Sequence, residues 1–359
     1  MLSVEATSLP PVSIALNSNE SAFGPSPRAV AAARAAASGL ERYYEEPAKT
    51  LAPAIAECFA LDERRIVIGH GSDDLLARLA RAYLEPGSEL VRSANGYLKT
   101  PNYAYANDAI PVAAADTGFT ASVDAILGCL SERTRMVYLA NPDNPAGTYL
   151  NGAEIRRLHA GLPDHVLLVL DCAYEEYVDA ADYEPAHRLV EEAGNVVMTR
   201  TFSKIFGLAG ARVGWLYGPQ TIVDVIDRIG VTFPVSSPSV AASLAALQDK
   251  GHVRHVFEAN VRLRDDLSRA LTAPGLKVYP SQTNFLLVEF PDPACSAEAA
   301  CISLRRKGIA LRRVASPAYR DCVRITIGLE SEVKAAEHGI MAFLKEKTDA
   351  RSSHCAQPG

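Results

Sequence analysis

Lys204 is a side chain of this sequence that could do covalent chemistry with a carbonyl compound. It follows an apolar segment, and a glycine-rich turn after it leads to Arg212. A lysine close to low-dielectric surroundings and to other cations can lose its proton at neutral pH, and can then act as a nucleophile or form a Schiff base. Taken alone, the dipeptide Ser203-Lys204 is also compatible with a solvated lysine in a loop.

Asp171 directly follows an apolar run over residues 166–170, which has the composition of a parallel strand buried on both faces. Ligands of open α/β sheets bind at the carboxyl ends of such strands. A carboxylate in so apolar a place needs a partner, because an unpaired buried charge is costly. The sequence therefore favours a ligand-binding Asp171, and a helix N-cap is the alternative role.

Two turns after other predicted strands could also hold parts of a ligand. Gly69–Asp74 joins a strand to a helix, and its glycines and the free N–H groups of the next helical turn favour an anion. The third glycine of a dinucleotide-binding loop is missing there, and Asp73 and Asp74 would repel a phosphate unless they point away. The turn over residues 141–148 would bring the Asn144 amide near the ligand of Asp171, although a plain turn also fits it.

Arg324 lies in a segment of alternating apolar and polar residues, Val323-Arg324-Ile325-Thr326-Ile327. This period of two predicts a strand whose apolar side chains face a core, with Arg324 on the opposite side. A guanidinium fixed on a rigid strand suits bidentate binding of a carboxylate or phosphate. A surface ion pair is the alternative.

Strand-like and helix-like segments alternate through the first two thirds of the chain, which predicts an α/β fold with a mostly parallel sheet and helices on both faces. After Pro238, long helical stretches surround three short strands, which predicts a smaller α+β domain. The predicted organisation is an N-terminal arm (1–27), a large domain (28–238), a small C-terminal domain (239–347) and a disordered tail (348–359).

Length and composition exclude several classes of protein. A chain of 359 residues is long enough for about two domains, and 48% hydrophobic with 22% charged residues is typical of globular proteins. No apolar run reaches the roughly 18 residues of a membrane span, and a net charge of −6 gives no reason to expect nucleic acid or an anionic membrane as a partner. Seven scattered cysteines predict no metal site and no disulfide framework, and the N-terminus lacks a signal-peptide pattern, so a cytoplasmic location is expected.

Along the chain, the glycine turn, Asn144, Asp171, Lys204, Arg212 and Arg324 follow one another in a specific order. In this order the chain resembles the fold-type-I enzymes that use pyridoxal 5′-phosphate, and among them the histidinol-phosphate aminotransferase family. The most specific matches are the lysine segment over residues 201–214 and the Asn-Pro-x-Asn-Pro-x-Gly turn over residues 141–147. The resemblance extends over about residues 13–346. Further matching segments are Leu16–Glu20, Gly24–Pro27, Arg42-Tyr43, Gly71–Asp73, Asp171–Tyr174 and Arg324–Gly328.

The resemblance implies roles for residues around the cofactor. Lys204 would hold pyridoxal phosphate as a Schiff base and then move a proton between the substrate Cα and C4′ of the cofactor. Asp171 would pair with the pyridine nitrogen and keep it protonated. The other implied contacts are Tyr97 stacked on the ring, Asn144 and Tyr174 at the phenolic oxygen, and Ser72, Asp73, Ser203 and Arg212 at the phosphate.

The resemblance also implies a homodimer with shared active sites, because the tyrosine that matches Tyr43 reaches the phosphate of the neighbouring subunit in that family. Arg324, Arg312 and Asn19 would bind the substrate. The implied reaction converts L-histidinol phosphate and 2-oxoglutarate into imidazole acetol phosphate and glutamate. One cationic pocket could then serve both halves of a ping-pong reaction.

The sequence departs from the family mostly where the substrate would bind. Thr100 stands at a position that is commonly aromatic, and the segments over residues 21–22, 233–236 and 316–321 also differ. A paralogous aminotransferase for an aromatic or cationic amino acid or keto acid is therefore an alternative. A pyridoxal-phosphate-dependent decarboxylase or lyase is a second one. A nicotinamide-dependent oxidoreductase is a third, suggested by Gly69–Ser72, and a non-catalytic binding module is the least supported.

Overall fold

The computed structural model describes residues 9–43 and 47–355. By its contacts the chain divides into two compact units, each described by itself below. Unit 1 comprises residues up to 22, 260–280 and 284 onward, and unit 2 comprises residues 23–259 and 281–283. The division therefore falls inside helix α10 (Lys250–Thr272), whereas the sequence analysis placed a boundary at residue 238.

Unit 2 contains a seven-stranded sheet in the order β2-β8-β7-β6-β5-β3-β4. The five strands from β7 to β4 run parallel to their neighbours, as predicted, while β8 runs antiparallel to both β2 and β7. The strands are β2 (Ile66–Gly69), β3 (Glu89–Ser93), β4 (Ile110–Ala114), β5 (Thr134–Ala140), β6 (Leu167–Asp171), β7 (Val196–Thr201) and β8 (Gly214–Tyr217).

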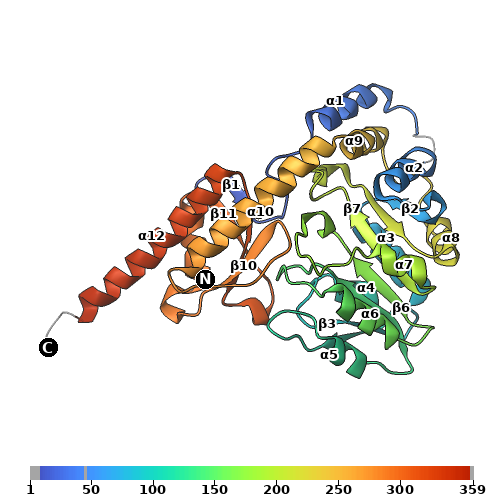
Figure 1. Ribbon diagram of the computed structural model, residues 1–359. Helices are drawn as coiled ribbons and strands as arrows, with labels where there is room; N and C mark the ends of the chain where they lie inside the picture. The colour runs from blue at the N-terminus through green and yellow to red at the C-terminus, as the bar shows by residue number, and fades with distance from the viewer. Residues whose placement is uncertain (1–8, 44–46, 356–359) are drawn as a thin grey trace, which may run out of the picture. The chain divides into compact units, whose positions relative to one another are not determined.

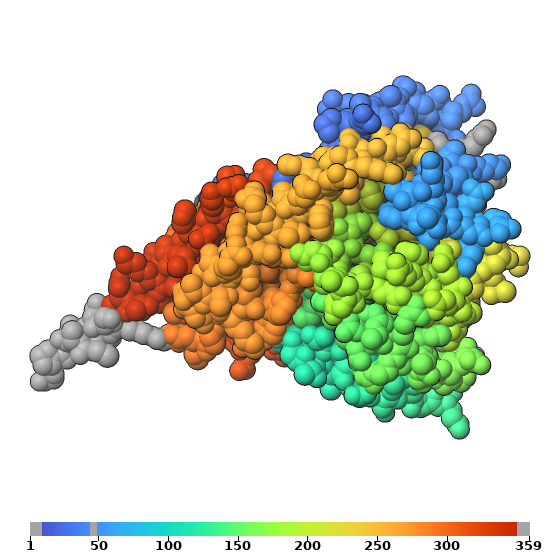
Figure 2. Space-filling model, in the orientation of Figure 1, coloured from blue at the N-terminus to red at the C-terminus, as the bar shows by residue number. Residues whose placement is uncertain are grey.

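Helices connect the strands of unit 2, and further helices precede β2 and follow β8 in the chain (Figure 1). α1 lies along α9, as both views of the molecule show (Figures 1 and 2). The helices are α1 (Pro27–Ala36), α2 (Pro47–Phe59), α3 (Ser72–Tyr83), α4 (Thr100–Tyr105), α5 (Val123–Gly128), α6 (Gly152–Ala160), α7 (His187–Glu192), α8 (Gln220–Arg228), α9 (Ser237–Gln248) and the first part of α10. Single 3-10 turns are η1 (Ala37–Gly39), η2 (Glu63–Arg65), η3 (Glu175–Tyr177) and η4 (Ala209–Ala211).

Both faces of the sheet are buried, which explains why its central strands are apolar throughout. In β6, Leu167 and Val169 belong to a core cluster with residues of α3, α4 and α8. Leu168 and Leu170 are equally buried, and because side chains alternate along a strand they face the opposite side. Helices α2 and α7 contact the sheet at β2 and β7.

The register of the parallel strands brings their carboxyl ends to one edge. Ala140 at the end of β5 pairs with Asp171 at the end of β6, and Asp171 pairs with Thr199 on β7. The chain then leaves β5 into the turn over residues 141–148 and leaves β7 into the segment that carries Lys204. This edge gathers most of the residues to which the sequence analysis gave a chemical role.

Unit 1 contains a five-stranded sheet in the order β1-β11-β12-β10-β9. Helix α11 packs on β11 and β12, α12 packs on α11, and the second part of α10 belongs to the same unit. Its elements are β1 (Ile14–Leu16), β9 (Lys277–Val278), β10 (Phe285–Glu289), η5 (Pro293–Cys295), α11 (Ala297–Arg306), β11 (Ile309–Arg313), η6 (Pro317–Tyr319), β12 (Cys322–Thr326) and α12 (Glu330–Cys355).

Both ends of the chain differ from the prediction. Part of the predicted N-terminal arm is strand β1, which pairs in parallel with β11. Helix α12 continues through the predicted tail as far as Cys355. Residues 356–359 lie outside the described part of the chain. Among the described residues, no helix is both long and apolar enough to cross a lipid bilayer.

Candidate active site

Asp171 is the buried acid at the carboxyl edge of the unit 2 sheet, as the sequence predicted. The Tyr138 hydroxyl donates a hydrogen bond of 2.7 Å to its Oδ2, and the Thr199 hydroxyl donates one of 3.2 Å to its Oδ1. Asp171 is the last residue of β6 and caps no helix, so the alternative role as an N-cap does not apply. A carboxylate held from two sides in this way has a fixed orientation.

Burial raises the pKa of Asp171 from its ordinary value of 3.8 to about 6, and the hydrogen bonds from Tyr138 and Thr199 oppose that rise. Desolvation destabilises the ionised form, so the carboxylate is close to half protonated near pH 6. A positively charged group beside Asp171 would stabilise the ionised form. The carboxylate is therefore suited to hold a protonated ring nitrogen of a ligand.

The N-terminus of α3 faces a guanidinium and a hydroxyl. Gly71 has φ of 78° and is the N-cap of α3, and a Cβ placed on it would lie 2.5 Å from Nη2 of Arg212. A Cβ on Gly214 would lie 2.4 Å from the Ser72 backbone nitrogen. Two glycines thus let strand β8 and Arg212 approach the first turn of α3. Nη1 of Arg212 also donates to the Ser203 hydroxyl at 3.2 Å.

This arrangement has the chemistry of an anion site. The first N–H groups of a helix of twelve residues have no partner within the helix, and the helix dipole favours negative charge there. No side chain caps α3 at Gly71. The backbone of Ser72, the Ser203 hydroxyl and the Arg212 guanidinium together suit a phosphate group.

The two aspartates that follow Ser72 have partners of their own. Asp73 accepts hydrogen bonds from the hydroxyls of Tyr103 (2.6 Å) and Tyr97 (3.2 Å), and Lys99 forms an ion pair with it at 3.1 Å. These partners lower the pKa of Asp73 against the opposing effect of burial. Asp74 instead accepts from Nε of Arg78 at 3.0 Å and from the His70 backbone N–H at 2.9 Å. Both carboxylates are thus engaged by donors, which removes the objection that their charges pose to a phosphate site.

Lys204 lies in the segment that follows β7. Its Nζ is 5.5 Å from the centre of the Tyr174 ring, and Tyr174 follows Asp171 by three residues. Gly207, three residues after Lys204, has φ of 68°, and a Cβ on it would collide with the Gly24 backbone. This close approach explains why the glycine-rich turn after the lysine tolerates no side chain there.

The turn after β5 begins beside Asp171. The Asn141 backbone N–H donates to the Asp171 carbonyl at 3.0 Å, and both Asn-Pro bonds of the turn are cis. The side chain of Asp143 accepts from the Asn144 backbone N–H at 2.7 Å and is buried. The turn that carries Asn144 therefore begins at the same edge of the sheet as Asp171, as the sequence predicted.

The Tyr97 ring stacks on the Tyr138 ring, with the ring centres 6.5 Å apart.

Unit 1 carries a second cluster of predicted residues. Arg324 on β12 and Arg312 on β11 are direct cross-strand partners, so their side chains lie on the same face. Arg324 is buried, and its Nη2 donates to the Asn17 carbonyl at 3.0 Å. Two like charges directly opposite each other destabilise a sheet, which an anion bound between them would relieve.

Asn19 lies in the same cluster. Its backbone N–H donates to the Thr326 hydroxyl at 3.0 Å, and the same hydroxyl donates to the Asn19 side chain at 3.1 Å. Thr326 follows Arg324 by two residues, so both side chains lie on one face of β12 as predicted. All five residues of β12 are buried, so the face that carries Arg324 is covered as well as the apolar one.

Tyr43, another predicted site residue of unit 2, lies at the surface. It is 77% exposed, and its ring stacks on that of Phe233 with centres 4.1 Å apart and planes at 12°. Phe233 is exposed as well. Two stacked aromatic rings on the surface form an apolar patch next to the N-terminal end of α2.

Four partners of the two aspartates were not predicted from the sequence: Tyr138, Thr199, Tyr103 and Lys99. Tyr138 and Thr199 are found only through the register of three adjacent strands, which a single sequence does not specify. Tyr103 follows Lys99 by one turn on α4, so a helix starting near Thr100 was the available signal.

Comparisons with known proteins identify the family of this chain. The family model described as aminotransferase class I and II matches residues 11–338. A histidinol-phosphate aminotransferase of Nitrobacter winogradskyi is 44% identical over 92% of this chain and 90% of its own length, and one of Rhodospirillum centenum is 45% identical over 92% and 91%. The crystal structure of histidinol-phosphate aminotransferase from Sinorhizobium meliloti in complex with pyridoxal-5′-phosphate superposes with a TM-score of 0.88 at 30% identity, over 93% of this chain and 91% of that one. The chain therefore belongs to the aminotransferase class I and II family.

Proposed function

We propose that this chain is a pyridoxal-phosphate-dependent aminotransferase that transfers the amino group of L-histidinol phosphate to 2-oxoglutarate. The observation that carries the proposal is the convergence of Asp171, Lys204 and the α3 N-terminus within unit 2. Relatives named histidinol-phosphate aminotransferase, at 43–45% identity over 92% of the chain, support the substrate assignment.

The residues present fit the cofactor. The phosphate of pyridoxal phosphate would be held by the backbone N–H groups of Ser72 and Asp73, the Ser203 hydroxyl and Arg212. Support comes from the close approach of Arg212 and β8 to the first turn of α3, which only glycine at positions 71 and 214 permits without a collision. A phosphate gains from this site because it combines charge-assisted hydrogen bonds with a helix dipole.

Tyr97 would stack on the pyridine ring, and Asp171 would pair with the ring nitrogen. Asp171 would hold the ring nitrogen in its protonated form, since an ionic partner compensates the desolvation of a buried carboxylate. Tyr138 and Thr199 would keep both carboxylate oxygens oriented. Asn144 and Tyr174 would hold the phenolic oxygen of the ring. The bound cofactor supplies an electron sink conjugated to the α-carbon of the substrate.

Lys204 would carry the cofactor covalently before substrate arrives, and would then move the proton at the reacting carbon. This role needs an amine that lies close to the cofactor and can lose its proton near neutral pH. Tyr174 lies beside the amine of Lys204, with its ring 5.5 Å away. It would therefore orient the lysine while it binds the cofactor oxygen.

Arg324, Arg312 and Asn19 would bind the anionic end of the substrate. Arg324 is buried on a strand and already held by a backbone carbonyl, so its guanidinium presents a fixed direction for bidentate pairing. The same pair of arginines would bind the phosphate of histidinol phosphate in one half-reaction and a carboxylate of glutamate or 2-oxoglutarate in the other.

We also propose that the enzyme acts as a homodimer with shared sites, in which Tyr43 reaches the cofactor phosphate of the partner subunit. The exposed, stacked pair of Tyr43 and Phe233 supports an interface at this surface. Mixing the inactive variants Lys204→Ala and Tyr43→Ala tests the idea. A mixed dimer would contain one complete site, so activity should reappear on mixing. No recovery in a solution shown to contain mixed dimers would contradict shared sites.

A paralogous aminotransferase with another substrate is the second candidate. The observation that favours it is Thr100, which is fully buried and donates to the Tyr97 carbonyl at 2.8 Å where the family commonly has an aromatic residue. Lys99, beside it, adds a cation paired with Asp73. Steady-state kinetics distinguish the candidates: kcat/KM for L-histidinol phosphate should far exceed that for every free amino acid in a panel with 2-oxoglutarate.

Covalent trapping tests the chemistry separately from the substrate. Sodium borohydride should fix a pyridoxyl group on Nζ of Lys204 in the holoenzyme, as located by peptide mass spectrometry. The variant Lys204→Ala should bind cofactor without being labelled and should lose turnover, whereas Lys307→Ala, at the surface of unit 1, should behave like the parent chain. Equal labelling of Lys204→Ala would refute the assignment of the reactive lysine.

A further inference from the structure

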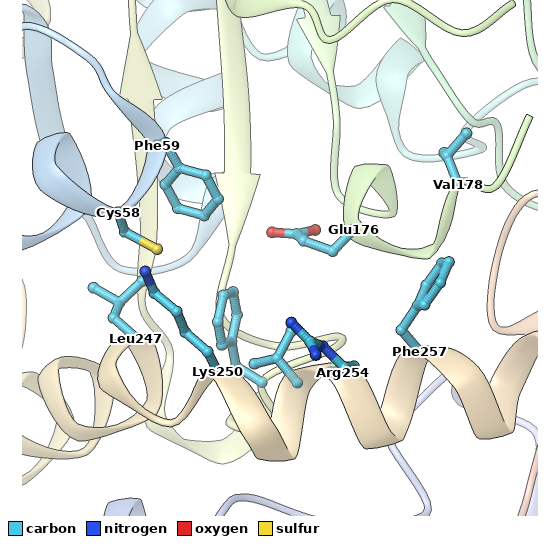
Figure 3. A pocket seen from close by; sticks show the side chains of 10 residues that line it. Cys58, Phe59, Glu176, Val178, Leu247, Lys250, Arg254 and Phe257 are labelled. Carbon is cyan, nitrogen blue, oxygen red and sulfur yellow. The ribbon is translucent and has the colours of Figure 1, made fainter. Parts of the chain in front are cut away.

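Unit 2 contains a pocket of about 400 Å³ that none of the predicted site residues lines (Figure 3). A volume of this size lies within the range of small-molecule sites. The pocket lies between α2, the turn η3, and helices α9 and α10. Its apolar lining comprises Phe59, Val178, Phe206, Leu247, Val253 and Phe257. Four further side chains add polarity: Cys58, Glu176, Lys250 and Arg254.

Two cations on α10 border the pocket. Lys250 and Arg254 are one helical turn apart and exposed, and Figure 3 shows the Lys250 amine directed toward the sulfur of Cys58. Within the described ranges, no ion pair joins either cation to an acidic side chain. Like charges four residues apart on a helix repel each other. A carboxylate bound between them would remove that repulsion.

An excess negative charge lies on the other side of the pocket. Figure 3 shows the carboxylate of Glu176 directed from η3 into the pocket. Arg200 donates to Glu176 and to Glu175, each at 2.6 Å, so one buried guanidinium serves two carboxylates. The charges of these three groups sum to −1 when all are ionised. Burial raises the pKa of Glu176, and the ion pair with Arg200 opposes that rise.

The pocket thus offers a positive side, a negative side and an apolar lining. A simple carboxylate would be attracted by Lys250 and Arg254 but repelled by Glu176. A simple amine would meet the opposite problem. An α-amino acid zwitterion satisfies both sides, because its carboxylate and its ammonium group are bonded to the same carbon atom of one small molecule.

We propose that this pocket binds a free α-amino acid with an apolar side chain, at a site separate from the residues assigned to catalysis. Its carboxylate would lie at Lys250 and Arg254, its ammonium group at Glu176, and its side chain among Phe59, Phe206 and Phe257. The proposal does not depend on which substrate the enzyme transaminates.

The molecule carries its own reporter of this site. Trp215 is the single tryptophan of the chain, its ring lies 5.5 Å from that of Phe59, and the Arg200 guanidinium lies over both rings. A ligand against Phe59 and Glu176 would change the surroundings of Trp215. Its fluorescence is therefore expected to change saturably on binding.

The test is a calorimetric titration of the holoenzyme with L-phenylalanine, followed in parallel by Trp215 fluorescence. We expect saturable binding that weakens at least about tenfold in Lys250→Gln/Arg254→Gln, since each loses a charge-assisted contact. Lys345→Gln, an exposed lysine of α12, is the matched control and should bind like the parent chain. N-acetyl-L-phenylalanine and L-phenylalanine methyl ester, which each lack one charge, should bind at least about tenfold more weakly than the amino acid.

Three results would overturn the proposal. They are absence of binding heat up to about 10 mM amino acid, equal affinity of the double variant and the parent chain, and equal affinity for the N-acetyl compound. Binding of L-phenylalanine at the active site would survive the double substitution, because neither residue belongs to the catalytic assignment. Both substituted side chains are exposed, and an unchanged cofactor spectrum would confirm that the variant is folded.

Discussion

The Tyr138 hydroxyl donates a hydrogen bond of 2.7 Å to Oδ2 of Asp171, and both side chains are buried at the carboxyl edge of the unit 2 sheet. The two residues are 33 positions apart and meet because β5 and β6 are adjacent in register. The bond lowers the pKa of Asp171 against the effect of burial. Tyr138 is therefore a positioning residue that keeps the acid available in its ionised form.

Substituting Tyr138→Phe should weaken cofactor binding near neutral pH. Loss of the donor lets the pKa of Asp171 rise further above 6, so that less of the carboxylate is ionised to hold a protonated ring nitrogen. A hydrogen bond to a charged group contributes about 1.5–3 kcal/mol, which corresponds to a loss of roughly ten- to a hundredfold in affinity. Spectroscopic titration with pyridoxal phosphate at pH 6.5 and 8.5 measures the effect.

The ratio of the dissociation constants of variant and parent should be smaller at the higher pH, since Asp171 loses its proton there in both chains. Tyr105→Phe removes a hydroxyl from an exposed tyrosine of α4 and should leave the titration unchanged. A ratio that does not depend on pH would mean that Tyr138 acts through packing and not through the charge of Asp171.

The raised pKa of Asp171 predicts how stability depends on pH in the cofactor-free chain. Between its ordinary value of 3.8 and its folded value of about 6, the folded state binds more protons than the unfolded state. The contribution of Asp171 to the free energy of unfolding is therefore fully present below pH 4 and is lost as the pH rises through 6. The total loss is about 3 kcal/mol.

Asp171→Asn removes this contribution, so the difference in free energy of unfolding between parent and variant should change by up to about 3 kcal/mol between pH 4 and pH 7. Urea denaturation of both chains at the two pH values measures it. Other buried acids such as Glu176 titrate in both chains and cancel in the difference. A constant difference would show that Asp171 has an ordinary pKa.

The sequence predicted the parts of the fold that depend on local pattern. Asp171 at the end of a buried strand follows from the apolar run before it, and the position of the Gly71 turn before α3 follows from two glycines ahead of an amphipathic helix. The alternation around Arg324 correctly predicted a strand over these residues, although both faces of that strand are buried. These features can be predicted from the spacing of apolar residues along the sequence and from the residue types found where strands end.

Other features depend on pairing between distant segments, which the pattern does not encode. Strand β8 runs antiparallel in a sheet that was predicted to be mostly parallel, and nothing in its four buried residues specifies a direction. The pairing of Arg312 with Arg324 also depends on register between two strands. In the same way, Ile14–Leu16 looked like part of an arm because three residues show no period, although they form a strand next to β11.

Arg324→Ala should raise KM for anionic substrates. Arg324 is buried and held by the Asn17 carbonyl, so truncation removes a partly desolvated partner of the substrate anion, at a cost of about 2–5 kcal/mol. Steady-state kinetics should show the loss mainly in kcat/KM, and the visible spectrum of the bound cofactor should be unchanged. Arg324→Lys should recover only part of the affinity, because an ammonium group cannot make the bidentate contact.

Arg306→Ala removes an exposed arginine of α11 and serves as the control for the loss of charge in unit 1. Its kinetics should match those of the parent chain. An equal rise in KM for both variants would indicate a general electrostatic effect of unit 1. An unchanged KM for Arg324→Ala would remove Arg324 from the substrate site.

Gly71→Ala should block the phosphate site more than it destabilises the fold. Gly71 has φ of 78°, and an alanine Cβ would meet Arg212 at 2.5 Å. Gly87 also has a positive φ, of 81°, and no atom lies within 4 Å of its Cβ position, so Gly87→Ala is a positive-φ substitution without the collision. Both variants should lose about 1–3 kcal/mol of stability because alanine disfavours a positive φ, as measured by urea denaturation. Only Gly71→Ala should lose more than about tenfold in affinity for pyridoxal phosphate, since Arg212 must move away from the α3 N-terminus to make room. Equal cofactor affinity in the two variants would show that this close approach does not shape the phosphate site.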